Sequence, residues 1–292
     1  MTTIKTFIKE HPVLTYYILT FVISWGGVYI LGAPYGMPTT SEQFTKVWPI
    51  VFIPYFLGPS MAGLLLTGLV HGRAGFRELL SRMLKWRVTF RWYAVALLTA
   101  PLVITPILLL LSLTSPVFLP DIFTSANKVS LIVSGILIGL IFGGILEELG
   151  WTGFAIPRLR RNYSVLTTGL IVGLLWGVWH LFPGFWGSGD ASGVFSPLLF
   201  FPPSLFFMGV LPAYRVLMVW VFDRTGSQFV IMLMHMSITA STLFILSPAA
   251  RGVQLMIYYV VLTAVTWVVI AIAAVANGGY LLRQPLPPRQ VA

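Results

Sequence analysis

Long apolar segments separated by short polar stretches dominate this sequence. Each apolar segment holds roughly the 20 residues that a helix needs to cross the hydrocarbon core of a bilayer. Eight of them can be drawn, at about residues 12–32, 47–70, 92–114, 128–149, 165–185, 197–222, 227–247 and 253–276. The pattern therefore predicts an all-α, polytopic membrane protein with eight transmembrane helices.

Composition supports the same class, because 57% of the residues are hydrophobic and only 9% are charged. A soluble domain of this length is not so apolar. The first apolar run is long enough to span and lacks the cleavage site of a signal peptide, so we expect it to be the first transmembrane helix. The absence of cysteine from the sequence excludes disulfides, thiolate metal sites and a thiol nucleophile. We expect the protein in the cell membrane, with the lipid bilayer as a partner.

Most of the 18 Lys and Arg residues fall in segments that eight crossings would place on one side of the bilayer. Cytoplasmic loops carry the excess of basic residues, so we expect both termini to be cytoplasmic. The most basic segment, residues 71–91, is interpreted as a cytoplasmic loop; a helix lying in the membrane interface is the alternative, which we favour less. The charges form short clusters rather than one patch, so no nucleic-acid partner is expected.

Two adjacent carboxylates, Glu147 and Glu148, interrupt the fourth apolar segment. A carboxylate inside a bilayer costs at least about 2.5 kcal/mol, so it marks a functional site by default. Glu147 continues a row of glycines at four-residue spacing, Gly135, Gly139 and Gly143, which share one helix face. Small residues on that face let another helix approach closely. We therefore expect Glu147 to point into the helix bundle.

Two histidines lie inside predicted spans, whereas the other two lie at segment ends. His180 continues a second glycine row, residues 169–177, and His235 is followed one turn later by Thr239. A single membrane histidine is about as often a hydrogen-bonding residue as a catalytic one. The combination with two glutamates favours a catalytic site.

The chemistry available to this set is hydrolysis by an activated water. A buried glutamate can act as a general base, with a histidine that shares the water. Zinc held by Glu147, His180 and His235 is the alternative, since two histidines and a carboxylate leave an open position. The sequence contains no H-E-x-x-H motif, which excludes the common zincin geometry. We favour a mechanism that requires no cofactor.

These residues resemble the CAAX protease and bacteriocin-processing (CPBP) family of intramembrane proteases, which includes the Rce1-like type II CAAX prenyl endopeptidases. The family signatures are an EExxxR helix, an FxxxH helix and an HxxxN or HxxxD helix. The corresponding segments here are Glu147-Glu148-Leu-Gly-Trp-Thr152, Trp176-Gly-Val-Trp-His180 and His235-Met-Ser-Ile-Thr239. The resemblance covers about residues 131–246.

The resemblance implies an eight-helix fold with the active site in a cavity open to the cytoplasmic leaflet. It implies that Glu147 is the general base, that Glu148 supports it and that His180 orients the water. His235 would donate to the oxyanion, with Thr239 nearby. The substrate would be a membrane-associated peptide or protein, prenylated or not.

Two positions depart from the family pattern. Thr152 stands in place of the arginine, and Thr239 stands in place of asparagine or aspartate. Arg215, inside the sixth span, could pair with Glu148 or reach the C-terminus of a substrate. We favour a third interpretation from sequence alone, in which its side chain extends to the nearby membrane interface.

The interpretation divides the chain into three parts: residues 1–126 with the first three helices and the basic loop, residues 127–250 with the catalytic core, and residues 251–292 with the last helix and a cytoplasmic tail. The leading function is an intramembrane endopeptidase that cuts near the cytoplasmic face. A non-catalytic scaffold or bacteriocin-immunity factor of the same family is the alternative, motivated by Thr152 and Thr239. A proton-relaying transporter is least favoured, because no repeated halves with broken helices are found.

Overall fold

A bundle of long helices makes up the computed structural model, which describes residues 4–282 and contains no named strand within them. The expected tail lies beyond residue 282, outside the described residues. The helices are α1 Ile4–Glu10, α2 Pro12–Gly32, α3 Ser41–Met83, α4 Phe90–Ser112, α5 Asp121–Thr124, α6 Lys128–Ile138, α7 Ile156–Leu159, α8 Val165–Trp186, α9 Pro197–Leu205, α10 Leu211–Thr225, α11 Gln228–Ala240 and α12 Gly252–Ala276.

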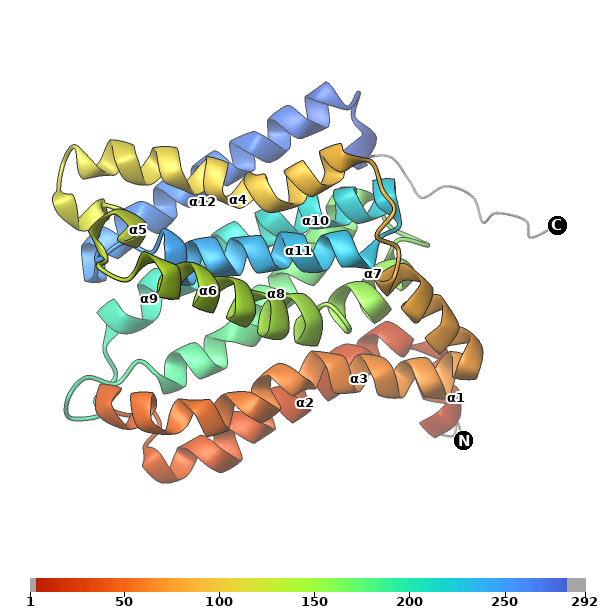
Figure 1. Cartoon of the computed structure of the whole chain (residues 1–292). Helices are drawn as coiled ribbons and strands as arrows, with labels where there is room; N and C mark the ends of the chain where they lie inside the picture. Colours follow the sequence, from red (N-terminus) through yellow and green to blue (C-terminus); the bar gives the residue numbers. More distant parts are fainter. Residues whose placement is uncertain (1–3, 283–292) are drawn as a thin grey trace.

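Eight helical stretches in the described part of the chain are long and apolar enough to cross a membrane. They confirm the predicted all-α class and the number of spans. Four of them join neighbouring elements into one stretch: α2 with the short turn Ala33–Tyr35, α6 to α7, α9 to α10, and α11 with the helical turn that follows it. The described ends of the chain, in α1 and after α12, lie at the same end of the bundle (Figure 1), as an even number of crossings requires.

The bundle is built in layers around α11. Helices α2 and α3 pack against each other as one outer layer, whereas α4 and α12 lie on the opposite side, and α6, α8, α10 and α11 form the middle (Figure 1). Helix α11 contacts α4, α6 and the continuation of α6, and α8 packs along α10. The spans that contain α10 and α11 are the most completely buried of the eight.

Helix α3 is longer than the second predicted span because the basic segment continues it. Its backbone turns at Gly72 (φ 57°, ψ −143°), a conformation that favours glycine, and the helix then runs on to Met83. Leu79 is buried in this second leg, whereas Phe76 and Leu80 are 42% and 53% exposed. The interpretation of residues 71–91 as a plain loop was therefore wrong for residues 73–83, which are helical.

Glycines set the closest approaches between the middle helices. A Cβ atom on Gly143 would lie 2.6 Å from Cδ2 of His235, and one on Gly173 would lie 2.5 Å from Cα of Pro212. Both distances are too short for any side chain. The two glycine rows seen in the sequence are therefore the surfaces on which α11 and α10 pack, and they bring the polar residues of the next section together.

Candidate active site

The two glutamates lie where the long helix that begins with α6 changes its winding. Residues Gly139–Glu147 and Trp151–Ala155 form π-helical stretches on either side of a short turn. Such widened turns are frequent at functional sites, because they re-aim side chains that a regular helix would direct elsewhere. Glu147 is 3% exposed and Glu148 is fully buried. Both carboxylates therefore depend on protein groups as hydrogen-bond partners.

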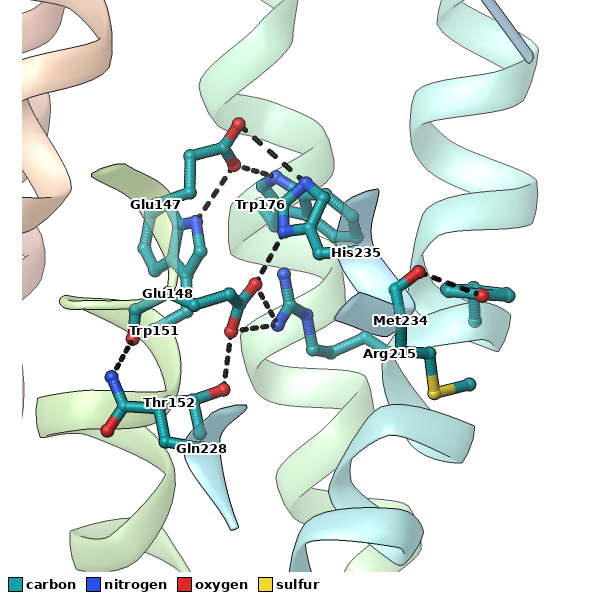
Figure 2. Close-up of polar contacts among 10 residues, drawn as sticks. Glu147, Glu148, Trp151, Thr152, Trp176, Arg215, Gln228, Met234 and His235 are labelled. Atoms are coloured by element: carbon teal, nitrogen blue, oxygen red, sulfur yellow. Dashed lines mark hydrogen bonds and ion pairs between the residues drawn. The ribbon is translucent and has the colours of Figure 1, made fainter. Parts of the chain in front are cut away.

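Two indoles hold one oxygen of Glu147. Trp151 and Trp176 donate their Nε1–H groups to Oε2, at 3.1 and 2.6 Å. The other oxygen, Oε1, lies 3.8 Å from Nε2 of His235, too far for a direct hydrogen bond (Figure 2). The carboxylate is thus fixed through one oxygen, while Oε1 has no donor within hydrogen-bond distance among the described residues.

His235 lies between the two carboxylates. Its Nδ1 is 2.6 Å from Oε1 of Glu148, and its Nε2 faces Glu147 (Figure 2). Glu148 is also paired with Arg215, so it is assigned as ionised and can only accept. The proton therefore belongs on Nδ1 of His235, which leaves Nε2 to accept a proton and, once protonated, to donate it.

Glu148 is the centre of a buried polar cluster. Its carboxylate accepts from Nη1 of Arg215 at 2.7 and 3.0 Å and from the hydroxyl of Thr152. Its backbone carbonyl accepts from Nε2 of Gln228 at 3.0 Å. Arg215 is itself fully buried. The expectation that Arg215 extends to the membrane interface was therefore wrong, because a carboxylate deep in the bundle pairs with it.

His180 shares the site without touching Glu147. Its Nδ1 is 2.9 Å from the carbonyl of Trp176, so Nδ1 carries the proton and Nε2 is left as an acceptor. The ring is half-buried and stacks on Phe207, with centroids 4.6 Å apart. No direct hydrogen bond joins His180 to Glu147 within residues 4–282, but both line one cavity. A bound molecule can therefore bridge them.

Thr239 faces the same cavity from the next turn of α11 after His235. Its Oγ1 lies 3.0 Å from the point that a Cβ on Gly143 would occupy, so the hydroxyl is close to the backbone of the glutamate-bearing helix. The five residues named from the sequence are thus assembled in two layers. Glu147, His180, His235 and Thr239 line the cavity, and Glu148 lies behind His235.

The cavity has a volume of about 280 Å³ and is mainly apolar. Aromatic rings supply much of its lining: Phe44, Phe52, Tyr55, Phe56, Phe142, Trp176, Phe206 and Phe207. Apart from the four site residues, its polar lining is limited to the Tyr55 hydroxyl, the Trp176 indole and Thr242. A ligand that fills it must present an apolar group.

The cavity extends from Glu147 away from the basic end of the bundle. Phe44 near the start of α3, Pro183 near the end of α8 and Leu243 beyond α11 all lie toward the other end. On the basic side, Trp151, Thr152 and Arg215 are fully buried and close the floor. The resemblance implied a cavity open to the leaflet that holds the basic loops. The structure instead places the cavity on the opposite side of Glu147.

The zinc set named from the sequence is not assembled as a metal site. Within residues 4–282, no group of three His, Asp or Glu side chains is arranged to hold an ion. The Nδ1 atoms of His235 and His180 are held by Glu148 and by a backbone carbonyl, so each ring presents Nε2 to the cavity.

The fold and site together define a multi-pass membrane protein with a buried cluster of two glutamates and two histidines. Residues 128–241 match the family described as type II CAAX prenyl endopeptidase, Rce1-like. The chain is also similar to CAAX prenyl protease 2 of Methanococcus maripaludis, with 24% identity over 220 residues, which cover 73% of this chain and 76% of that protein. The motif resemblance is thus supported by the family model over residues 128–241 and by similarity to this membrane-protease relative.

Sequence reasoning missed three members of the site. Trp151 and Trp176 were not assigned as donors to Glu147, and Gln228 was not noticed. The spacing held a signal for the first two, since Trp151 follows Glu147 by four residues and Trp176 precedes His180 by four, each on the same helix face. No sequence signal points to Gln228, which meets Glu148 only because α11 begins beside it.

Proposed function

We propose that the protein is an intramembrane endopeptidase in which Glu147 activates a water molecule. The observation that supports this most is the asymmetry of the Glu147 carboxylate. Two indoles occupy Oε2, while Oε1 lies in the cavity, 3.8 Å from Nε2 of His235. A distance of that size between polar atoms leaves room for a bridging group.

In the proposed reaction, a water donates one hydrogen bond to Oε1 of Glu147 and another to Nε2 of His180. Glu147 removes a proton as the water oxygen attacks the carbonyl carbon of the peptide. The tetrahedral intermediate carries its negative charge on the former carbonyl oxygen. The proton on Glu147 then passes to the amide nitrogen, and the C–N bond breaks to give a carboxylate and an amine.

His235 stabilises the oxyanion in this proposal. In its doubly protonated form, which takes its second proton from solvent before the substrate binds, it donates from Nε2 to the developing charge, and Glu148 behind it stabilises this imidazolium. Thr239 supplies a hydroxyl near the same point. Because these groups are held by buried partners before the substrate arrives, little reorganisation is needed during the reaction.

The substrate class follows from the cavity and from the relative. An apolar, aromatic-lined space next to Glu147 suits a membrane-associated peptide with an apolar group near the scissile bond. The relative is a CAAX prenyl protease by name, so a prenylated CAAX peptide is one candidate. A non-prenylated hydrophobic peptide is the other.

The basic end of the bundle is proposed to face the cytoplasm of a cell, with both termini on that side. Glu147 precedes Arg158 by eleven residues along the same long helix. The rise of about 1.5 Å per residue places the carboxylate roughly 16 Å from the basic end. The cut would therefore occur near the middle of a hydrocarbon core about 30 Å thick.

A non-catalytic scaffold or immunity factor was the alternative, and it was motivated by Thr152 and Thr239 in place of the family's arginine and asparagine or aspartate. Arg215 supplies a guanidinium to Glu148 from another helix, so the first of these two grounds is weakened. No observation in the described residues favours the proton transporter.

The test is proteolysis by purified protein in detergent. The probes are a quenched fluorescent peptide that ends in a farnesylated CAAX sequence, the same peptide without the lipid, and a hydrophobic transmembrane peptide. Wild type is compared with Glu147→Gln and His180→Ala. Cleavage of one probe by wild type, with loss in both variants, is expected; equal cleavage by all three proteins would reject the proposal.

A further inference from the structure

The ion pair between Arg215 and Glu148 is unusually well buried. Both side chains are 0% exposed, and the nearest Arg215 nitrogen lies 2.7 Å from the carboxylate. Removing two charges from water carries a large desolvation penalty, which is offset only by good geometry and further hydrogen bonds. A pair of this kind in the middle of a membrane protein is thus more easily explained by a function than by stability.

The second observation is where the pair connects. Glu148 accepts from Nδ1 of His235 at 2.6 Å through Oε1, the same oxygen that Arg215 approaches most closely. The guanidinium carbon also lies 4.1 Å from the ring centroid of Trp176, whose N–H donates to Glu147 at 2.6 Å. Arg215 therefore contacts Glu148, which holds His235, and Trp176, which holds Glu147 (Figure 2).

The third observation is how Arg215 reaches this position. Its helix α10 packs on α8 at Gly173, where an added Cβ would lie 2.5 Å from Cα of Pro212 and 3.0 Å from Cβ of Arg215. A larger residue at position 173 would displace α10. The glycine row of α8 thus holds Arg215 close enough to bind Glu148.

Arg215 also supplies the guanidinium that position 152 lacks. Thr152 stands where the resembled pattern has arginine, and its hydroxyl reaches Glu148 from four residues away. A side chain at position 152 is therefore directed at the same carboxylate that Arg215 binds. The positive charge beside Glu148 is thus supplied by Arg215 of α10 and not by position 152.

We infer that Arg215 is a positioning residue that replaces the missing arginine: it keeps Glu148 ionised, and Glu148 in turn fixes the orientation and tautomer of His235. Arg215 does not line the cavity, so it acts through Glu148 and Trp176 and not by touching the substrate. The catalytic part of this inference rests on the proposed function. The ion pair itself does not.

The first experiment removes the positive charge at position 215 and restores one at position 152. Activity on the peptide that wild type cleaves is measured for Arg215→Met and for the double variant Thr152→Arg/Arg215→Met. For Arg215→Met, kcat should fall at least tenfold while KM stays within about twofold, because the cavity is unchanged. The double variant should recover at least a third of the lost kcat. An unchanged kcat in Arg215→Met would overturn the inference, and so would a fall in kcat that the double variant does not recover.

The matched control is Arg160→Gln. Arg160 also forms a bidentate pair, with Asp223 at 2.9 and 3.1 Å, but its helix end lies away from the cavity. It should leave kcat and KM unchanged. A loss of kcat in this control as large as that in Arg215→Met would contradict a specific role for Arg215.

The second experiment needs no substrate and so separates this inference from the proposed function. Melting temperatures in detergent are compared for Glu148→Gln, Arg215→Met and the double variant. Each single variant should melt well below wild type because it leaves an unpaired buried group, and the double variant should melt above Arg215→Met. Additive losses would show that the two residues do not act as a pair.

Discussion

The indole N–H of Trp176 donates to Oε2 of Glu147 at 2.6 Å, and the two residues lie on different helices, 29 residues apart in the sequence. This bond and the one from Trp151 decide which oxygen of the carboxylate remains available. They are hydrogen bonds to a charged acceptor in a buried setting, where such bonds are strongest. The reactive face of Glu147 is thus set by tryptophans and not by the histidines alone.

Trp176→Phe should therefore lower kcat by about tenfold or more, because a hydrogen bond to a charged group contributes about 1.5–3 kcal/mol. The phenyl ring keeps most of the packing against Arg215. Peptide cleavage measured over a range of substrate concentrations checks this. Trp220→Phe is the control, since its Nε1–H has no partner among the described residues, and it should cleave at the wild-type rate. Equal rates in all three proteins would show that the bond is dispensable.

Gly143→Ala should disturb the site without changing any polar group. The added methyl would lie 2.6 Å from the ring of His235, so the ring or α11 must shift. Overpacking of this kind costs about 1–3 kcal/mol. We expect a lower melting temperature and a large loss of cleavage. Gly26→Ala is the control, because no atom lies within 4 Å of its added Cβ. Wild-type melting temperature and cleavage in Gly143→Ala would mean that α11 packs less closely on the continuation of α6 than described.

Activity should not depend on a bound metal. Cleavage by protein dialysed against EDTA and treated with 1,10-phenanthroline is expected to match that of untreated protein, and the purified enzyme should contain far less than one zinc per chain. The physical reason is that no three His, Asp or Glu side chains among the described residues are grouped to hold an ion. Loss of activity on chelation, restored by zinc, would replace the glutamate mechanism with a metal-dependent one.

The orientation in the membrane can be tested with single cysteines, because the sequence contains none. Thr89→Cys lies in the basic end, and Ser192→Cys lies in the connection between α8 and α9 at the other end. Both positions are exposed. In intact cells, a membrane-impermeant thiol reagent should label only position 192. Labelling of position 89 alone would place the basic end outside and reverse the proposed topology.

The sequence predicted much of this fold, since the spans depend on segment length and hydropathy alone. It also predicted that Glu147, His180 and His235 would converge, because glycine rows mark the faces on which helices meet. The position of Arg215 could not be predicted in the same way. From sequence, an arginine near the end of a span is equally compatible with the interface, and only the packing of α10 on Gly173 directs it inward.

The direction of the cavity was also beyond the sequence. It depends on which side chains fill the space around Glu147, and the buried cluster of Glu148, Thr152, Arg215 and Gln228 fills the basic side. The π-helical winding around residues 139–155 also could not be predicted from the sequence. Periodicity predicted a regular helix, whereas the π-helical turns change which face each glutamate presents.

The central claim is that Glu147 is the base, and the most direct measurement is the cleavage rate of Glu147→Gln relative to wild type under saturating peptide. Glutamine keeps the shape and can still accept from both indoles, so the variant should fold, with a melting temperature close to that of wild type. General-base catalysis contributes about 10²–10⁴-fold, so kcat should fall by at least 100-fold. A folded Glu147→Gln protein that retains more than a tenth of the wild-type kcat would contradict the account.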